Sequence, residues 1–268
     1  MTPSRVPTSE LLDRVRQRRS EVRAFLAWAA DAERSWSLRM RNRPDIARAR
    51  HAVSLFPEEW WGLVVYSCFD SITGTEFAAH AFQRPLSSEH AEAVLGQFTF
   101  PRGSVGGHRI QPAVIGAKRA LVAACGGADV LSSVLLGNGS FEERYARIRS
   151  ARLPQWGRTT TFDLLLRAGA LGVGDSFYEP EFAQLDGSTG PKKGFKKIWG
   201  VEITTENAAW GEALLRAWTD EWQRVTAEAG VDWEGEPYTP ADFENTLCIW
   251  QEHRYDSLGG GDSKTSTA

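Results

Sequence analysis

The stretch SFEERYARIRSARLPQWGRTTTFDLLL, residues 140–166, decides the fold that we predict for this chain. Ser140 followed by Glu143 is a capping-box pattern, which predicts a helix over residues 140–152. A short apolar turn that ends at Gly157 separates it from a second helix, expected over residues 159–169. The segment therefore predicts two helices joined by a tight turn.

The start of the second helix is suited to a phosphate group. Its first backbone N–H groups have no partner within the helix, and the helix dipole is positive at this end. Gly157 allows close approach to that backbone, while Leu153 and Trp156 are expected to hold the turn to the core. Three further donors follow: Arg158, Thr159 and Thr160. The alternative is a plain connection between two helices, because Gln155 stands where many DNA-binding hairpins have a first glycine.

The rest of the chain predicts an all-α fold in one domain over residues 1–258, with a flexible tail over residues 259–268. Residues 64–69 are apolar and are interpreted as the buried part of a helix rather than a strand. The longest irregular stretch is expected over residues 173–200. Further helices are expected over residues 9–32, 45–55, 57–69, 73–98 in two pieces broken near Pro85, 112–124, 128–136, 206–229 and 240–255.

Composition favours an ordinary globular protein of 268 residues, 42% hydrophobic. No apolar run approaches the ~20 residues that span a bilayer, and the N-terminus lacks an apolar signal segment. We therefore expect a soluble, cytoplasmic monomer that does not bind membranes. The three cysteines and five histidines are scattered without zinc-binding spacing, so no metal and no cofactor is expected.

Charge is unevenly distributed along the chain. The net charge of −3 by itself argues against a nucleic-acid partner. Residues 1–50, however, hold twelve arginines against six acidic residues, whereas residues 201–268 hold four basic residues against fourteen acidic ones. A duplex meets local faces rather than the total, because salt screens fields beyond ~10 Å. Of the eleven tryptophans, most are expected in the core and some as stacking platforms for bases.

Four segments resemble the alpha-glutamyl/putrescinyl-thymine pyrophosphorylase family, which is similar in fold to helix-hairpin-helix DNA glycosylases. The resemblance covers about residues 140–255, and it implies a helix-hairpin-helix DNA glycosylase-like domain. The segments are residues 157–165, 174–177, 185–194 and 244–254.

The chain departs from the family in two places. Thr189-Gly190-Pro191 stands where the family usually has Ser-His-Arg, although Lys192 and Lys193 follow with the basic character. The hairpin has threonine where bifunctional glycosylases carry a Schiff-base lysine, so a glycosylase here is expected to be monofunctional and to use an activated water.

The resemblance implies a DNA glycosylase that excises a modified pyrimidine, such as glucosylated hydroxymethylcytosine, from double-stranded phage DNA in antiviral defence. Such an enzyme flips the nucleotide out of the stack and leaves an abasic site. Two alternatives stay open. One is an amine or amino acid:DNA transferase acting on pyrophosphorylated hydroxymethyl-pyrimidine DNA, and the other is a binding module for modified DNA without chemistry.

Three carboxylates are candidates for catalysis, because a carboxylate stabilises an oxocarbenium-like centre or deprotonates a nucleophile. Asp186 is the first choice, since the following Gly187-Ser188 predicts an exposed turn; alternatively it holds that turn. Asp175 follows the hairpin by about one helix, and alternatively caps a short helix. Asp163 lies within the second hairpin helix, where a bridging acid is the alternative.

Two further groups complete the expected site. Backbone contacts are assigned to Gly157, Arg158, Thr159, Thr160, Ser188, Lys192, Lys193 and Lys196, and Lys197 joins them as a grip on the backbone or the modification; the alternative for the lysines is a solvated loop. The base pocket is assigned to Trp60, Trp61, Glu244, Asn245 and Glu252. Adjacent residues on a helix point about 100° apart, so at most one of the two tryptophans faces DNA and the other is core. For the acids, a surface helix is the alternative.

Overall fold

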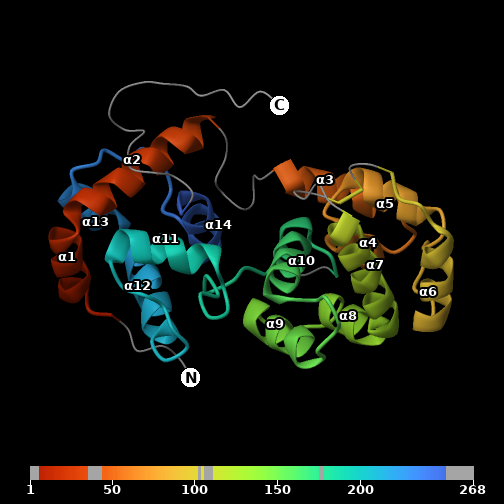
Figure 1. The fold of residues 1–268 in the computed structure, drawn as a ribbon. Helices are drawn as coiled ribbons and strands as arrows, with labels where there is room; N and C mark the ends of the chain where they lie inside the picture. The colour runs from red at the N-terminus through yellow and green to blue at the C-terminus, as the bar shows by residue number, and fades with distance from the viewer. Residues whose placement is uncertain (1–5, 36–43, 102–103, 106–110, 175–177, 252–268) are drawn as a thin grey trace. The chain divides into compact units, whose positions relative to one another are not determined.

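The computed structural model describes residues 6–35, 44–101, 104–105, 111–174 and 178–251, which form fourteen helices and no strand (Figure 1). The all-α prediction is therefore confirmed for this part of the chain. None of the described helices is both long and apolar enough to cross a membrane. The contacts divide the chain into two compact units, where the sequence analysis expected one domain. Unit 1 is Met1–Met40 with Phe182–Ala268, and unit 2 is Arg41–Glu181.

Unit 2 is built around α4 (Glu59–Phe69). Every residue of α4 from Trp60 to Phe69 is buried, and the helix packs against α3, α5, α7, α8 and α10. The apolar residues 64–69 therefore belong to a buried helix, as predicted. The other helices of unit 2 are α3 (Pro44–Val53), α5 (Ile72–Ala79), α6 (Ser88–Gln97), α7 (Gln111–Gly126), α8 (Ala128–Leu135), α9 (Phe141–Ser150) and α10 (Arg158–Leu171). The expected break near Pro85 falls between α5 and α6.

The capping box predicted at the start of α9 is present. The Glu143 backbone N–H donates to the Ser140 hydroxyl at 3.2 Å, and the Ser140 N–H donates to the Glu143 carboxylate at 2.9 Å. Because both donors at the helix start are satisfied, the chain enters α9 in one defined direction.

A buried arginine joins α8 to α9. The Arg144 side chain is 1% exposed and donates to the carbonyl oxygens of Gly139 at 3.0 Å and Leu135 at 3.2 Å, and also to those of Val134 and Gly137. Its guanidinium lies 4.1 Å from the centre of the Tyr178 ring, and burial raises the pKa of that tyrosine to about 12. Arg144 thus satisfies carbonyl groups that the end of α8 leaves without helical partners.

Replacing this arginine is expected to destabilise the fold strongly. Arg144→Met should lower the free energy of unfolding by about 3 kcal/mol, because several buried carbonyls lose a charged donor. Arg147→Met is the matched control: Arg147 is exposed and should change stability by at most about 0.5 kcal/mol. Urea unfolding followed by circular dichroism measures both, and equal effects would show that the Arg144 contacts carry no stability.

Unit 1 has an aromatic core. Its helices are α1 (Thr8–Gln17), α2 (Arg19–Ser35), α11 (Gly190–Trp199), α12 (Ala208–Asp220), α13 (Trp222–Ala229) and α14 (Pro240–Trp250). Trp218 is fully buried and contacts the rings of Trp199, Trp222 and Phe243 at centroid distances of 5.1, 6.1 and 5.2 Å. The prediction that most tryptophans are core residues is confirmed among those described.

Two helices that the periodicity predicts as continuous are each interrupted by one residue. The helix expected over residues 9–32 divides at Arg18, and the one expected over residues 206–229 divides at Glu221. The Arg18 side chain turns to α11, where its Nε donates to the Ile198 carbonyl at 3.0 Å. The apolar spacing continues through both breaks, so the pattern by itself does not reveal them.

The stretch expected to be irregular contains a helix. Residues 190–199 form α11, with Pro191 in its first turn, a position that proline favours. Phe195, Ile198 and Trp199 are buried on one side. The four lysines therefore lie on an amphipathic helix and not in a flexible loop, which corrects the sequence-based prediction.

Helix α11 packs directly on α14 through two glycines one turn apart. A side chain at Gly190 would overlap the Cys248 sulfur, and one at Gly194 would overlap the Leu247 carbonyl oxygen. Close approach of the two backbones therefore requires these glycines. The contact also brings together two of the segments on which the family resemblance depends, residues 185–194 and 244–254.

A methyl group at this contact is expected to separate the helices. Gly194→Ala should lower the free energy of unfolding by about 2 kcal/mol, as overpacking does. Gly96→Ala in α6 is the control, since a methyl group there meets nothing within 4 Å, and alanine should stabilise the helix by up to about 1 kcal/mol. Denaturant titration compares the two; a stabilised Gly194→Ala variant would contradict the close contact.

Candidate nucleic-acid interface

The turn between α9 and α10, residues 151–157, lies at the surface of unit 2. Gly157 is exposed and is the N-cap of α10, with extended backbone angles (φ −75°, ψ −173°), and no side chain caps the helix there. A Cβ added at Gly157 would meet nothing within 4 Å. Neither the backbone nor the packing of unit 2 therefore requires glycine at this position, which leaves room for an external group beside the first N–H groups of α10.

Gln155 stands where many DNA-binding hairpins have a first glycine, but its backbone has a conformation that glycine favours. Gln155 has φ +66°, in the left-handed region that glycine favours, and Arg152 has φ +50°. The turn thus takes, at Gln155, the kind of backbone that a glycine would supply.

Two apolar side chains hold the turn to α7, as the sequence predicts. Trp156 is 4% exposed, and its Nε1 donates to the Ala120 carbonyl at 2.9 Å. The Leu153 side chain lies where a side chain at Gly127 would be, next to the end of α7. Because these contacts fix one side of the turn, Gly157 and the start of α10 face outward.

Arginines surround the turn, and residues 144–162 contain five of them and no acidic residue. Apart from the buried Arg144, they are exposed or half-buried, and Arg149 supports the turn by donating to the Trp156 carbonyl at 2.9 Å. Arg119 of α7 is also exposed and directly precedes Ala120, the acceptor for Trp156. We call the following set the hairpin face: Arg119, Arg149, Arg152, Gln155, Gly157, Arg158, Thr159 and Thr160.

Sequence reasoning missed several members of the hairpin face. Arg149 and Arg152 could have been found from the sequence, because residues 144–162 contain several arginines and no acidic residue. Arg119 carries no such signal; it is included because it is exposed on α7 and precedes Ala120, whose carbonyl accepts from Trp156.

Two of the three predicted carboxylates lie in the described residues, one in each unit. Asp163 is half-buried in α10, and Asp175 lies outside the described residues. Asp186 belongs to unit 1, where it is exposed and accepts a hydrogen bond from the Thr205 hydroxyl at 3.4 Å.

The turn that carries Asp186 is held from inside unit 1. The buried Glu212 carboxylate accepts the backbone N–H of Ala183 at 2.8 Å and that of Leu185. Ser188, predicted to contact DNA, is 6% exposed, and its hydroxyl donates to the Leu185 carbonyl at 2.7 Å. Ser188 thus stabilises the turn instead of presenting a free hydroxyl at the surface.

The lysines of α11 have separate surroundings. Lys197 donates to the Trp250 carbonyl at 3.1 Å and lies 4.3 Å from the centre of the Trp250 ring, so it caps α14; burial lowers its pKa. Lys196 forms an exposed ion pair with Glu202 at 2.9 Å. Lys192 is half-buried and Lys193 is exposed. Lys193 is therefore the lysine most available to a partner of α11.

The residues assigned to the base pocket do not offer an open stacking surface. Trp61 is fully buried and donates to the Phe82 carbonyl at 2.7 Å, and Trp60 is 7% exposed and donates to the Glu58 carboxylate. Both rings thus belong to the core of unit 2, where at most one of them was expected to face DNA. Glu244 is buried and Asn245 half-buried in α14 of unit 1, and Glu252 lies outside the described residues.

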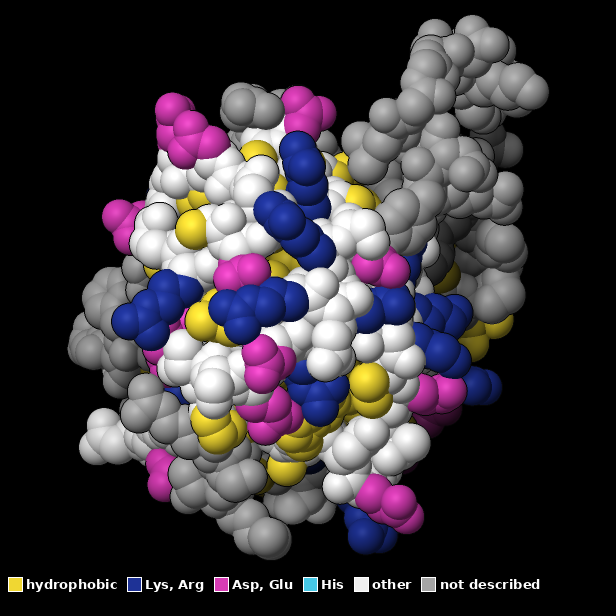
Figure 2. Space-filling view, turned by 90° about the vertical axis from the view of Figure 1, so that its left-hand side faces the viewer, with side chains coloured by type: hydrophobic (Ala, Val, Ile, Leu, Met, Phe, Trp, Pro, Cys, Tyr) yellow, Lys and Arg dark blue, Asp and Glu magenta, His cyan; other side chains and the backbone are white. Residues whose placement is uncertain are grey.

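Three arginines near the N-terminus are paired with acids. Arg14 contacts Glu10 at 3.2 Å, Arg16 contacts Glu228 at 3.1 Å and Arg18 contacts Glu21 at 3.1 Å. The face shown in Figure 2 carries basic and acidic side chains next to one another. The basic excess of residues 1–50 therefore does not make a uniformly positive surface there.

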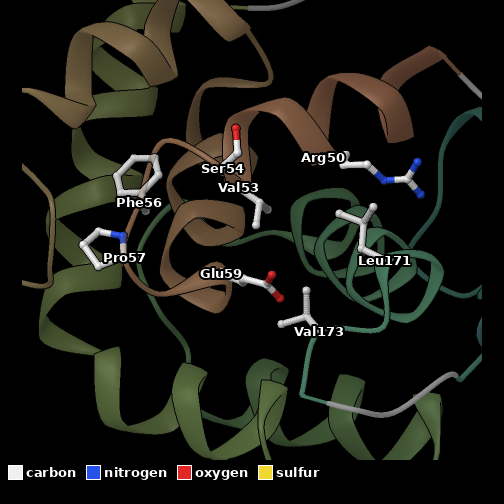
Figure 3. A pocket seen from close by; sticks show the side chains of 8 residues that line it. All are labelled: Arg50, Val53, Ser54, Phe56, Pro57, Glu59, Leu171 and Val173. Atoms are coloured by element: carbon white, nitrogen blue, oxygen red, sulfur yellow. The ribbon is translucent and has the colours of Figure 1, made fainter.

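A groove of about 450 Å³ lies elsewhere in unit 2, at the opposite end of α10 from the turn (Figure 3). It is formed by α3, the connection to α4, the first turn of α4 and the end of α10. Five of its eight lining residues are apolar, two are charged and one is a serine. The lining residues are Arg50, Val53, Ser54, Phe56, Pro57, Glu59, Leu171 and Val173.

Comparison with known proteins gives no match: no family, no curated protein and no solved structure is significantly similar to this chain. The functional argument therefore depends on the geometry described above.

Proposed function

We propose that this protein binds double-stranded DNA through the hairpin face and excises a modified pyrimidine from it. The observation that carries the proposal is the exposed start of α10, where no side chain caps the N–H groups and Gly157 leaves space for a phosphate. The acid-free run of arginines beside it adds the positive charge that a nucleic-acid backbone requires.

The hairpin face supplies binding without base recognition. Backbone N–H groups, threonine hydroxyls and arginines are typical phosphate donors, and such contacts position a protein on a duplex. Because each phosphate contact releases counterions, the affinity should fall steeply with salt. Selection of the modified base must come from another surface.

The proposed chemistry is hydrolysis of the N-glycosidic bond of an extruded nucleotide. A carboxylate accepts a proton from water as the water oxygen bonds to C1′ of the deoxyribose. The bond from C1′ to the base breaks, its electron pair leaves with the base, and the base takes up a proton. Asp186 is the first candidate for this carboxylate because it is exposed on a turn that Glu212 and Ser188 hold in place. Asp175 is the second candidate.

A binding module without chemistry is the second candidate function. It is favoured by one observation: the groups on the hairpin face are of the kind that bind phosphate, and none of them is a carboxylate. The resemblance also implies a transferase as an alternative. The product analysis that tests excision tests this alternative as well.

Adding a carboxylate at the turn should weaken DNA binding without lowering the stability of the fold. Gly157→Asp should cap α10, leaving stability unchanged or raised by a few tenths of a kcal/mol, but should weaken duplex binding at least tenfold by repelling phosphate. Asn138→Asp is the control, since it adds a negative charge at another exposed position of unit 2. Fluorescence anisotropy with a labelled duplex measures affinity; unchanged affinity of the Gly157→Asp variant would refute the role of the turn.

Product analysis should distinguish the chemistries. Duplexes with plain, hydroxymethylated or glucosylated hydroxymethyl-cytosine are incubated with the protein, and released bases are identified by mass spectrometry. Excision predicts a free modified base and abasic sites. If Asp186 activates the water, Asp186→Asn should reduce the rate of base release at least a hundredfold. If Asp175→Asn abolishes base release and Asp186→Asn does not, Asp175 is the carboxylate that activates water.

Other outcomes count against excision. A DNA base of increased mass, formed only on pyrophosphorylated DNA with an amino acid or amine present, indicates the transferase. Retention of modified DNA without any product indicates the binding module.

A further inference from the structure

We infer that the groove at the end of α10 receives the nucleotide that is extruded from a duplex held at the hairpin face. This inference rests on the proposed function, and it places the base pocket in a groove of unit 2.

The groove has the size of a small-molecule site. Its volume of about 450 Å³ falls within the range of such sites. Among its apolar lining residues, Val53, Phe56 and Val173 are almost fully buried and Pro57 is exposed. A planar base would cover apolar surface here, as flipped bases do between apolar side chains.

The groove has two charged side chains, Arg50 and Glu59, and both are exposed. In Figure 3 the Glu59 carboxylate points into the space between Val53 and Val173, whereas the Arg50 side chain extends past Leu171. A carboxylate accepts hydrogen bonds from N–H groups on a base edge, and a guanidinium pairs with phosphate. The Ser54 hydroxyl is already used, since it donates to the His51 carbonyl at 2.7 Å. The groove therefore fits a nucleotide whose base edge donates toward Glu59 and whose phosphate lies at Arg50.

Helix α10 connects the groove to the hairpin face within one unit. Its fourteen residues span about 20 Å, with Arg158 at the hairpin end and Leu171 at the groove. Arg167, buried on α10, donates to Asp70 at the end of α4 at 2.6 Å and so fixes the groove end of the helix. The two sites are thus held about 20 Å apart, which corresponds to about six base-pair steps of 3.4 Å.

Trp60 and Trp61 follow Glu59 in α4 and belong to the core that supports the first turn of that helix.

The test measures extrusion of the base from the duplex, a step that does not require catalysis. The probe is a duplex with glucosylated hydroxymethylcytosine opposite 2-aminopurine, whose fluorescence rises when its partner leaves the stack. The intact chain is expected to raise the fluorescence. Leu171→Trp fills the groove and should reduce the rise at least tenfold, with anisotropy-measured affinity for a plain duplex changed less than twofold. Leu136→Trp is the control, because Leu136 is 51% exposed at the end of α8 and does not line the groove.

A second pair of variants tests the carboxylate. Glu59→Gln should reduce the fluorescence rise severalfold, whereas Glu92→Gln, an exposed acid on α6, should leave it unchanged. Thermal melting followed by circular dichroism confirms that each variant is folded. Glu59 is exposed, so its replacement by the isosteric amide should preserve the fold.

The outcomes separate the two proposals. If the intact chain does not bind the duplex, both the proposed function and this inference are wrong. If it binds without a rise in fluorescence, or if the Leu171→Trp variant keeps the full rise, the groove is not the base pocket, while DNA binding through the hairpin face stands.

Discussion

The contact of Trp156 and Leu153 with α7 is the constraint on which the candidate interface depends. Burying these two side chains holds one side of the turn against unit 2, and this leaves the opposite side, with Gly157 and the start of α10, in solvent. The N–H groups at a helix start need partners from outside the helix. Because no side chain caps α10, its dipole and its amides are available to an anion.

The turn between α9 and α10 has a local excess of positive charge. The net charge of the chain is −3, and many arginines near the N-terminus are engaged by glutamates. Around the turn, by contrast, arginines occur without acidic residues over residues 144–162. Since electrostatic fields fall off within ~10 Å in salt, this local set outweighs the overall negative charge for a ligand at the turn.

In the proposed function, helix α10 links phosphate binding to base recognition within unit 2. Phosphate contacts at one end do not depend on base identity, whereas the groove at the other end is lined by five apolar side chains and carries the Glu59 carboxylate. The packing of α10 on α3, α4 and α9 keeps these two ends at a constant separation. In unit 1, the close packing of α11 on α14 has a different role, because it joins two segments of the family resemblance and uses the lysine side of α11 partly to cap α14.

The sequence by itself determined the helical class, the capping box of α9, the break near Pro85, the turn held by Trp156 and the buried nature of residues 64–69. These features show in the sequence because capping residues, a proline and apolar residues within each segment indicate them, even where the partner lies far along the chain. Tertiary structure decided the rest: the breaks at Arg18 and Glu221, the helix over residues 190–199, the use of Lys197 to cap α14 and the burial of Trp60. Several of these depend on a partner distant in sequence, such as Ile198 for Arg18 and α14 for α11, and the residue pattern alone does not specify which segments meet.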